Sequence, residues 1–195
     1  MISKYTRGSG FLEGFLAKKR AEKANSLIPI AYRGGRILDV GCGSYPYFLI
    51  NTEFNEKYGL DPSLSKLKIK NLKLKKTDVT EQHLPLSNNF FDAVTMLAVF
   101  EHIDNDKLEF VLKEIRRVLK NGGVLIITTP SPWSDKLLHR MAVVGLISSE
   151  EIHEHKTHHS KARIKDIIVK AGFRRKNLQS GYFEFGFNMW FKVVK

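Results

Sequence analysis

The chain has 195 residues, enough for one domain with a buried core and too few for two domains of ordinary size. Hydrophobic residues make up 43% and charged residues 27% of it, which excludes a disordered or fibrous chain. The apolar runs are far shorter than the roughly 20 residues that cross a bilayer, and residues 1–10 carry no export signal, so we expect a cytoplasmic protein without a membrane span.

The net charge of +12 attracts anionic partners, which makes nucleic acid an alternative partner to consider. Basic residues concentrate in residues 18–23, 66–76 and 174–195. Aromatic residues are not interleaved with these lysines along the chain, as single-strand binding would favour, so we interpret the charge as ordinary solvated surface.

The first elements are a helix and a strand. Residues 11–28 alternate apolar and basic side chains irregularly, which predicts an amphipathic helix beside the domain. Residues 36–40 form a short apolar run that predicts a buried strand. We therefore divide the chain into an N-terminal helix region, residues 1–35, and a main domain, residues 36–195. Further strand-like segments lie at residues 57–60, 72–77, 91–97 and 124–129, while residues 64–74 are ambiguous between helix and strand.

The clearest predicted helix spans Lys107–Leu119, with apolar side chains on one face and charged ones opposite. We expect the following Asn121–Gly123 to close it, because a glycine can take the left-handed conformation there. Ser160 is expected to cap a second helix that runs to Ala171 and ends at Gly172. The alternation of strands with helices predicts an α/β fold with a parallel sheet.

Two closing strands are predicted at residues 174–179 and 187–194, joined around residues 181–186. The only cysteine, Cys42, has no partner for an internal disulfide, which fits a reducing compartment.

The sharpest motif is residues 37–46, where a buried strand runs into two glycines and then into Pro46, a residue suited to a first helical turn. Small residues let a ligand approach the backbone, although a plain tight turn would use them too. Asp61 follows Gly41 at the spacing of about 20 residues at which an acidic residue binds ribose. Tyr45 and Pro46 replace the later glycine of a dinucleotide site, which disfavours NAD.

The stretch Leu38–Gly43 resembles the first signature of the class I S-adenosylmethionine-dependent methyltransferases, particularly their type 11 small-molecule group. Other stretches that resemble the family follow in order: Thr77–Val79, Leu84–Val94, Ala98–Ile103 and Arg117–Gly123. The resemblance implies a Rossmann-like α/β domain with a single seven-stranded, mostly parallel sheet flanked by helices and a C-terminal antiparallel strand. It also implies S-adenosylmethionine as the cofactor.

The family pattern carries over to particular residues as roles in cofactor binding. It implies that Asp39 orients the turn and the cofactor ammonium, that Gly41, Cys42, Gly43 and Ser44 line the methionine portion, that Asp61, followed by Pro62, holds the ribose, that Asp78 and Val79 meet the adenine, and that the Leu97 backbone closes the site. Asp78 could instead cap a turn, and Val79 could be ordinary core. Tyr45 stands where many members have a third glycine.

Methyl transfer from a sulfonium needs alignment more than covalent help, yet an oxygen or nitrogen acceptor must lose a proton. Histidine is the natural base. His102 follows the fourth strand at the edge where such folds bind ligands, although it could merely fix the loop. His155 and His158 are further candidates in a cluster with His153 and His159, whose spacing matches no zinc signature, so we assign no metal site.

We expect the acceptor pocket above the cofactor, built from residues 130–159, Glu101–His102 and the N-terminal helix. Apolar residues such as Trp133 and Met141 favour a small-molecule acceptor for O- or N-methylation, or else C-methylation, although a helix packed on the core explains the same spacing. An RNA methyltransferase and a non-catalytic S-adenosylmethionine-binding module stay open as alternatives, and the oligomeric state is not predicted.

Overall fold

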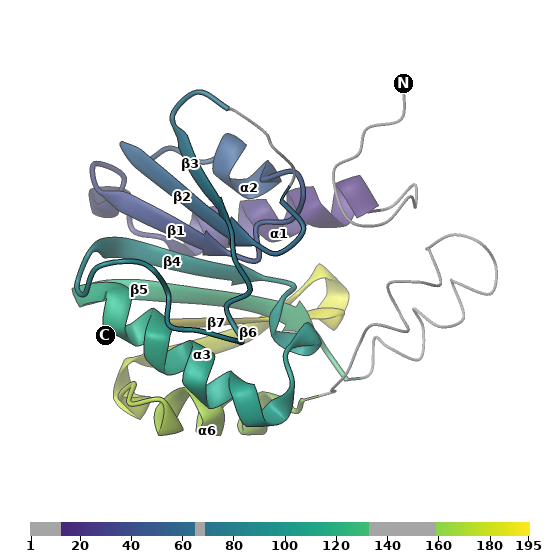
Figure 1. Cartoon of the computed structure of the whole chain (residues 1–195). Helices are drawn as coiled ribbons and strands as arrows, with labels where there is room; N and C mark the ends of the chain where they lie inside the picture. The colour runs from purple at the N-terminus through teal and green to yellow at the C-terminus, as the bar shows by residue number, and fades with distance from the viewer. Residues whose placement is uncertain (1–12, 65–68, 133–158) are drawn as a thin grey trace.

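In the computed structural model, residues 13–64, 69–132 and 159–195 are described. They form a seven-stranded sheet with the strand order β3-β2-β1-β4-β5-β7-β6 (Figure 1). The strands are β1 (Arg36–Val40), β2 (Glu56–Asp61), β3 (Leu72–Lys76), β4 (Phe91–Leu97), β5 (Leu119–Pro130), β6 (Leu178–Phe183) and β7 (Asn188–Val194). Neighbours among β1 to β5 pair in parallel, and β7 pairs antiparallel with both β5 and β6. The fold class predicted from the sequence is confirmed.

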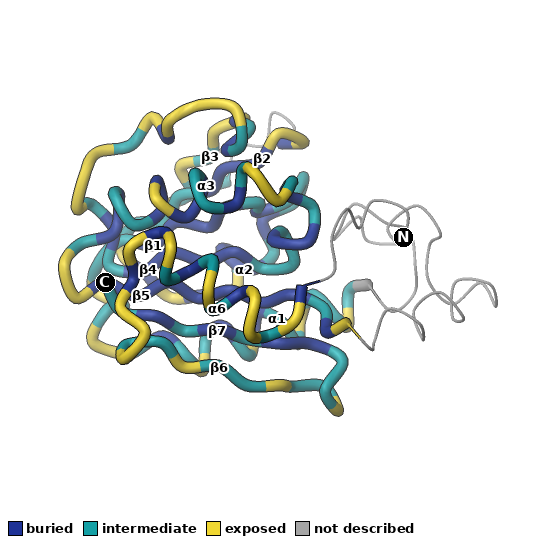
Figure 2. The backbone as a smooth tube through the Cα atoms, turned by 90° about the horizontal axis from the view of Figure 1, so that it is seen from below, coloured by how far each residue is buried: buried dark blue, intermediate teal, exposed yellow. Residues whose placement is uncertain are grey.

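Helices cover both faces of the sheet (Figure 1). They are α1 (Glu13–Leu27), α2 (Tyr47–Ile50), α3 (Asn105–Val118) and α6 (Lys161–Lys170), with short 3-10 turns η1 (Ile30–Tyr32), η2 (Phe100–His102), η3 (Arg175–Asn177) and η4 (Glu184–Gly186). One core lies under α3 and α6, and a second lies under α1 and α2. Because strands β1, β4 and β5 lie between these two cores, most of their residues are buried (Figure 2).

Helix α1 packs directly on the sheet. Its residues Ala21 and Ala24, and Ile28 directly after it, are buried in the same core as Ile37 of β1 and Ile126 of β5. Two small alanines on one helix face let the helix approach the strands closely. The α1 segment is therefore part of the packed structure of the domain.

Two boundaries differ from the expectation. Helix α3 ends at Val118, and the chain enters β5 at once because Leu119 already pairs with Phe91 of β4. Gly122 does take a positive φ of 79°, but it lies within β5, where its N–H donates to the carbonyl of Lys195. At the other end, Arg175–Asn177 forms a 3-10 turn instead of the predicted start of a strand.

The predicted second helix is confirmed. Ser160 caps α6 by accepting a hydrogen bond from the backbone N–H of Arg163, and Gly172 follows the helix with a φ of 95°. In the segment that was ambiguous, residues 72–74 belong to β3, while residues 65–68 lie outside the described part of the chain.

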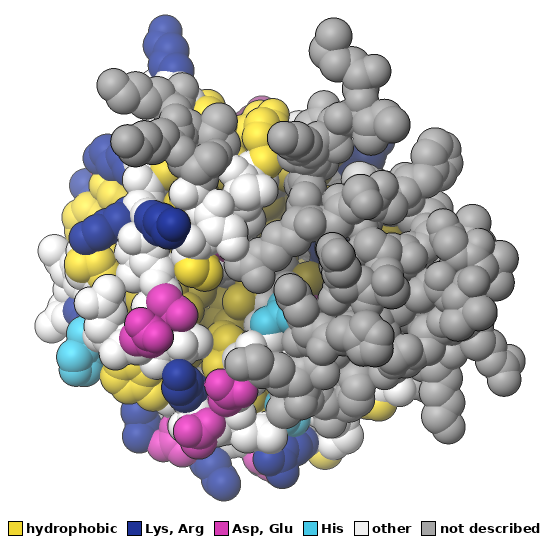
Figure 3. Space-filling model, turned by 45° about the vertical axis from the view of Figure 1, so that its right-hand side comes forward, with side chains coloured by type: hydrophobic (Ala, Val, Ile, Leu, Met, Phe, Trp, Pro, Cys, Tyr) yellow, Lys and Arg dark blue, Asp and Glu magenta, His cyan; other side chains and the backbone are white. Residues whose placement is uncertain are grey.

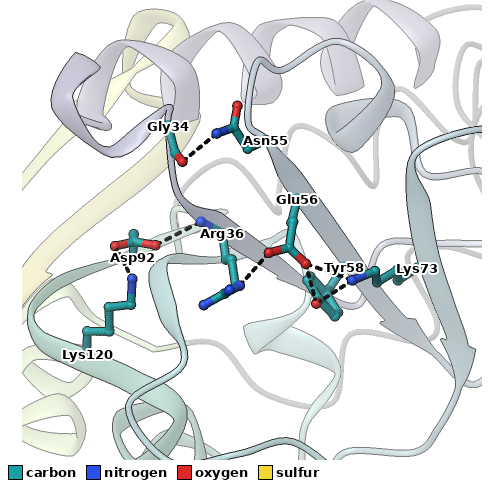
Figure 4. Close-up of polar contacts among 8 residues, drawn as sticks. All are labelled: Gly34, Arg36, Asn55, Glu56, Tyr58, Lys73, Asp92 and Lys120. Carbon is teal, nitrogen blue, oxygen red and sulfur yellow. Dashed lines mark hydrogen bonds and ion pairs between the residues drawn. The ribbon is translucent and has the colours of Figure 1, made fainter.

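A polar network ties the amino ends of the strands together (Figure 4). Glu56 of β2 accepts from Arg36 at 2.6 Å and from Lys73 of β3 at 2.7 Å, and these bonds with that from Tyr58 lower the pKa of Glu56 to about 2. Asp92 accepts from the backbone N–H of Arg36 at 2.8 Å. The loops that follow the strands, and any ligand site there, lie at the opposite edge.

Candidate functional site

The glycine motif forms a tight turn directly after β1. Gly41 and Gly43 both have a φ of 76°, a conformation that residues with a side chain avoid. The N–H of Gly41 donates to the carbonyl of Leu60 at 2.8 Å, and the N–H of Gly43 donates to Asp61 Oδ2 at 2.9 Å. The turn after β1 and the acidic end of β2 are therefore joined.

Asp61 is held rigidly at the end of β2. Asp61 is only 2% exposed, and its Oδ1 accepts from the N–H of Ser63 at 2.6 Å. Pro62 is exposed beside it. Two backbone amides thus orient the carboxylate toward the glycine turn, as a ribose-binding residue requires.

Asp39 lies behind the turn, at the end of β1. Its Oδ1 accepts from the Thr95 hydroxyl at 2.6 Å. Burial raises the pKa of Asp39 to about 7, the Thr95 bond opposes the rise, and the charge of Asp61 adds to it. A buried carboxylate of this kind is stabilised in its charged form by a cation placed nearby.

Cys42 and Ser44 complete the turn. Cys42 is buried, its Sγ would lie 2.8 Å from a Cβ at Gly59, and burial raises the pKa of its thiol. Such a thiol packs as a small apolar group and is a poor nucleophile. Ser44 is half-buried, at the rim of the turn.

The loop after β3 continues the same edge. The N–H of Thr77 donates to the carbonyl of Asp61 at 3.3 Å, which places Asp78 next to the end of β2. Asp78 Oδ1 accepts from the N–H and hydroxyl of Thr80 at 2.9 and 2.8 Å, and Val79 is buried in the core under α3. The structural roles that the sequence left open are therefore both present: Asp78 caps a turn and Val79 belongs to the core.

The end of β4 closes against the glycine turn. Leu97 is half-buried and pairs with Thr128 of β5. Ala98 takes a φ of 54°, and the chain then brings Val99 against Gly41, so a Cβ at Gly41 would lie 2.2 Å from Val99 Cγ2. Asp39, Gly41 to Ser44, Asp61, Asp78 and Leu97 thus share one edge of the sheet.

Helix α3 holds the part of the β3–β4 connection that returns to the start of β4, through a charged pair that sequence reasoning missed. Arg117 donates to the carbonyls of Leu84 and Leu86, each at 2.9 Å, and to Glu114 Oε2 at 2.7 Å. Glu114 accepts from the N–H of Leu84 at 2.8 Å, and the Arg117 bond contributes most to lowering the pKa of Glu114 to about 2. The i, i+3 spacing on a predicted helix was a visible signal for the pair, but its loop partners were not.

Beyond the turn lie the residues expected near an acceptor. Glu101 of η2 is only 4% exposed, and its Oε2 accepts from the hydroxyl of Thr129 at 2.9 Å. His102 is half-buried next to it. His159 is buried, its ring meets that of Phe100 edge-on at 5.5 Å, and its Nδ1 accepts from Arg163 Nε at 3.2 Å. The sequence analysis expected Glu101 in the acceptor pocket together with His102, but it did not foresee the bond from Thr129.

Several predicted residues lie outside the described residues. These are His155 and His158, together with His153, Trp133 and Met141. In the described ranges, no three His, Cys, Asp or Glu side chains are grouped as metal ligands. Nor does any helix in those ranges have the length and apolar character of a membrane span. The face of the molecule drawn in Figure 3 is hollowed, with hydrophobic side chains on the floor of the hollow.

Comparisons with known proteins agree with this arrangement. Residues 38–127 match the methyltransferase domain family. An uncharacterised protein of Methanocaldococcus jannaschii is 36% identical over 147 residues, 75% of this chain, and the chain spans 58% of the length of that relative.

Solved structures share the fold. A crystal structure of an S-adenosylmethionine-dependent methyltransferase from Archaeoglobus fulgidus superposes with a TM-score of 0.72 at 19% identity, covering 95% of this chain and 98% of that one. A phosphoethanolamine N-methyltransferase of Haemonchus contortus in complex with S-adenosylmethionine gives a TM-score of 0.64 at 17% identity, covering 91% and 52%. The methyltransferase domain match and the shared fold support the predicted class I S-adenosylmethionine-dependent methyltransferase family, with S-adenosylmethionine as the cofactor.

Proposed function

We propose that the protein transfers the methyl group of S-adenosylmethionine to a nucleophilic oxygen or nitrogen of a small molecule. The observation that carries this proposal is the glycine turn after β1, which is hydrogen-bonded to buried Asp61 at 2.9 Å and backed by buried Asp39. When bound, the cofactor supplies an electrophilic methyl group on a sulfonium. The protein then needs to hold, orient and desolvate the reactants.

Asp39 and Asp61 are suited to the two polar parts of the cofactor. The pKa of about 7 for Asp39 shows how poorly its charge is solvated, so the cofactor ammonium would gain a strong partner there. Asp61 accepts from the amides of Gly43 and Ser63, which hold its carboxylate beside the glycine turn, where it would accept from the ribose hydroxyls. Gly41, Cys42, Gly43 and Ser44 would line the methionine portion, with Pro62 beside the ribose.

Asp78, Val79 and the Leu97 backbone would bound the adenine. The Asp78 carboxylate already fixes its own turn through Thr80, so it would shape the pocket as well as contact the base. Arg117 and Glu114 hold the adjoining loop from the other side. They are positioning residues, because their contacts are with the loop.

On the acceptor side we assign the general base to His102. It lies at the carboxyl edge next to Glu101, whose carboxylate is fixed by Thr129 at 2.9 Å. His102 would take the proton that an oxygen or nitrogen acceptor loses. Roles for His155 and His158 stay predictions, as does transfer to carbon.

Calorimetry with S-adenosylhomocysteine tests the cofactor site. Asp61→Ala should weaken binding by at least about tenfold, because a hydrogen bond to a charged group is worth roughly 1.5 to 3 kcal/mol. Asp106→Asn is the matched control, since Asp106 is exposed on α3. An Asp61→Ala protein that is folded and binds as tightly as the wild type would refute the assignment.

The acceptor class needs its own experiment. Incubating the protein with a labelled methyl donor and a cell extract, followed by separation of small molecules from RNA, distinguishes the alternatives. Label in small molecules supports the proposal. Label in RNA supports the alternative that the charge of +12 suggests, and no label at all supports a non-catalytic module.

A further inference from the structure

The turn between β6 and β7 exposes a phenylalanine on a strained backbone. Glu184, Phe185 and Gly186 have φ angles of 52°, 54° and 87°, and Phe185 is 97% exposed. Left-handed conformations are costly for residues with a side chain and cluster at functional sites. Because the Phe185 ring buries almost no surface, it contributes nothing to the fold that would offset this strain.

Hydrogen bonds hold the turn in place. The side chain of Asn188 donates to the carboxylate of Glu184, and the N–H of Phe187 donates to the Glu184 carbonyl at 3.0 Å. The N–H of Ser131 donates to the Phe187 carbonyl at 2.8 Å, which ties the turn to the end of β5. The exposed ring is therefore presented by a structured turn.

This turn lies at the edge of the sheet that carries the cofactor site. Strand β6 runs in the same direction as β1 to β5, so the turn after Phe183 follows its carboxyl end. Pro130 at the end of β5 pairs with Asn188 at the start of β7. Figures 1 and 2 show the turn projecting at the end of the β6–β7 hairpin.

Basic and aromatic side chains of α1 lie beside the turn. Burial raises the pKa of Glu184, and the bond from Asn188 and the nearby charges of Arg20 and Lys19 oppose the rise. Phe15 is 55% exposed, with Lys19 Nζ 5.6 Å from its ring centroid. We call Phe15, Lys19, Arg20, Lys23 and Phe185 the aromatic–basic rim.

The tertiary structure places aromatic side chains next to basic side chains that are distant from them in the sequence. Lys23 Nζ lies 4.9 Å from the ring of Trp190 on β7, and Lys161 Nζ lies 4.5 Å from the ring of exposed Tyr182 on β6. Aromatic and basic side chains that are far apart along the chain thus meet at this hairpin. Acidic groups of the described residues beside the rim include Glu22, which pairs with Lys19 at 2.9 Å, and half-buried Glu184.

We propose that the aromatic–basic rim docks the protein on an anionic membrane surface, with Phe185 inserted at the boundary between headgroups and acyl chains. The rim combines an apolar ring with lysines and arginine, which anionic headgroups attract. Phe185 stands on a projecting turn, whereas single-stranded nucleic acid is bound in a basic groove lined by aromatic rings. The consequence that the methyl acceptor is an amphipathic molecule drawn from the bilayer rests on the proposed function; the docking does not.

Sedimentation with lipid vesicles tests the docking. We expect binding to vesicles of phosphatidylcholine mixed with phosphatidylserine, none to phosphatidylcholine alone, and weaker binding as salt rises from roughly 50 to 200 mM. Phe185→Gly should weaken binding by about tenfold or more, because one inserted phenylalanine is lost. The unfolding midpoint of this variant should be unchanged or higher, since glycine accepts the positive φ. Ile30→Asn is the matched control, because Ile30 is 86% exposed near the opposite edge.

Other outcomes would overturn the inference. These are no binding to the anionic vesicles, undiminished binding by Phe185→Gly, or an equal loss in Ile30→Asn. Binding of oligouridine that depends on Phe185, without vesicle binding, would assign the rim to RNA instead. Vesicle binding without any affinity for S-adenosylhomocysteine would support the docking and refute the proposed function. Affinity for S-adenosylhomocysteine without vesicle binding would refute the docking and leave the proposed function standing.

Discussion

Alanine at Gly41 and at Gly43 makes a matched pair of perturbations. Both glycines have the same φ of 76°, so the added side chain meets the same backbone strain at each position. Their surroundings differ. A Cβ at Gly41 would lie 2.2 Å from Val99 Cγ2 and 2.9 Å from Val99 Cγ1, whereas at Gly43 the nearest atom is a backbone oxygen at 3.7 Å.

The expected losses of stability follow from these two terms. The left-handed conformation costs an alanine about 1–2 kcal/mol at either site. Overpacking against Val99 adds about 1–3 kcal/mol at Gly41 alone. We therefore expect Gly41→Ala to lower the free energy of unfolding by about 2–5 kcal/mol and Gly43→Ala by about 1–2 kcal/mol.

Urea unfolding without cofactor measures both values. Adding Val99→Ala to the Gly41→Ala protein should restore part of the loss, because it removes the clashing methyl groups. Gly43→Ala should in addition weaken S-adenosylhomocysteine binding. Its methyl group would occupy the open space beside the turn, where we propose that the amino-acid portion of the ligand binds. Equal destabilisation by the two alanines, with no recovery from Val99→Ala, would show that the contact with Val99 does not explain why residue 41 is glycine.

Four further predictions concern ionisable side chains. The pKa of Asp39 is raised from 3.8 to about 7, so the folded protein without cofactor should lose stability as pH rises from about 4 to about 7. Asp39→Asn should abolish this slope in urea titrations, and a slope that persists would contradict it. S-adenosylhomocysteine affinity should rise over the same pH range, because its ammonium favours charged Asp39; calorimetry that finds tighter binding at pH 5 than at pH 8 would exclude the pairing. Arg117→Met should lower the free energy of unfolding by about 3–5 kcal/mol, because it leaves Glu114 buried without its main partner, and Arg117→Lys should lower it less. Equal unfolding midpoints for Arg117→Met and the wild type would contradict the role of this pair in holding the loop. His102→Asn should lower kcat while leaving cofactor affinity intact, and unchanged kcat would remove His102 as the base.

The cofactor edge could be predicted because its pattern is local. A strand that runs into Gly41 and a second strand that ends at Asp61 place the two residues at the carboxyl edge of a parallel sheet, where consecutive strands are usually neighbours. The hydrogen bond from Gly43 to Asp61 is the direct result. Side chains with distant partners could not be predicted this way: the bond from Thr95 to Asp39 joins residues that are 56 apart in the sequence.

The sequence by itself determined the alternating strands and helices, the family, and the residues around the glycine turn, because hydrophobic periodicity and short-range spacing encode them. Only the tertiary structure brought Arg117 onto the loop at Leu84, Lys23 onto Trp190, and the strained turn at Phe185 to the edge of the sheet that holds Asp61. These contacts depend on how β1 to β7 are ordered in the sheet and on which face each helix covers. Packing of the whole chain sets that order, and no local pattern specifies it.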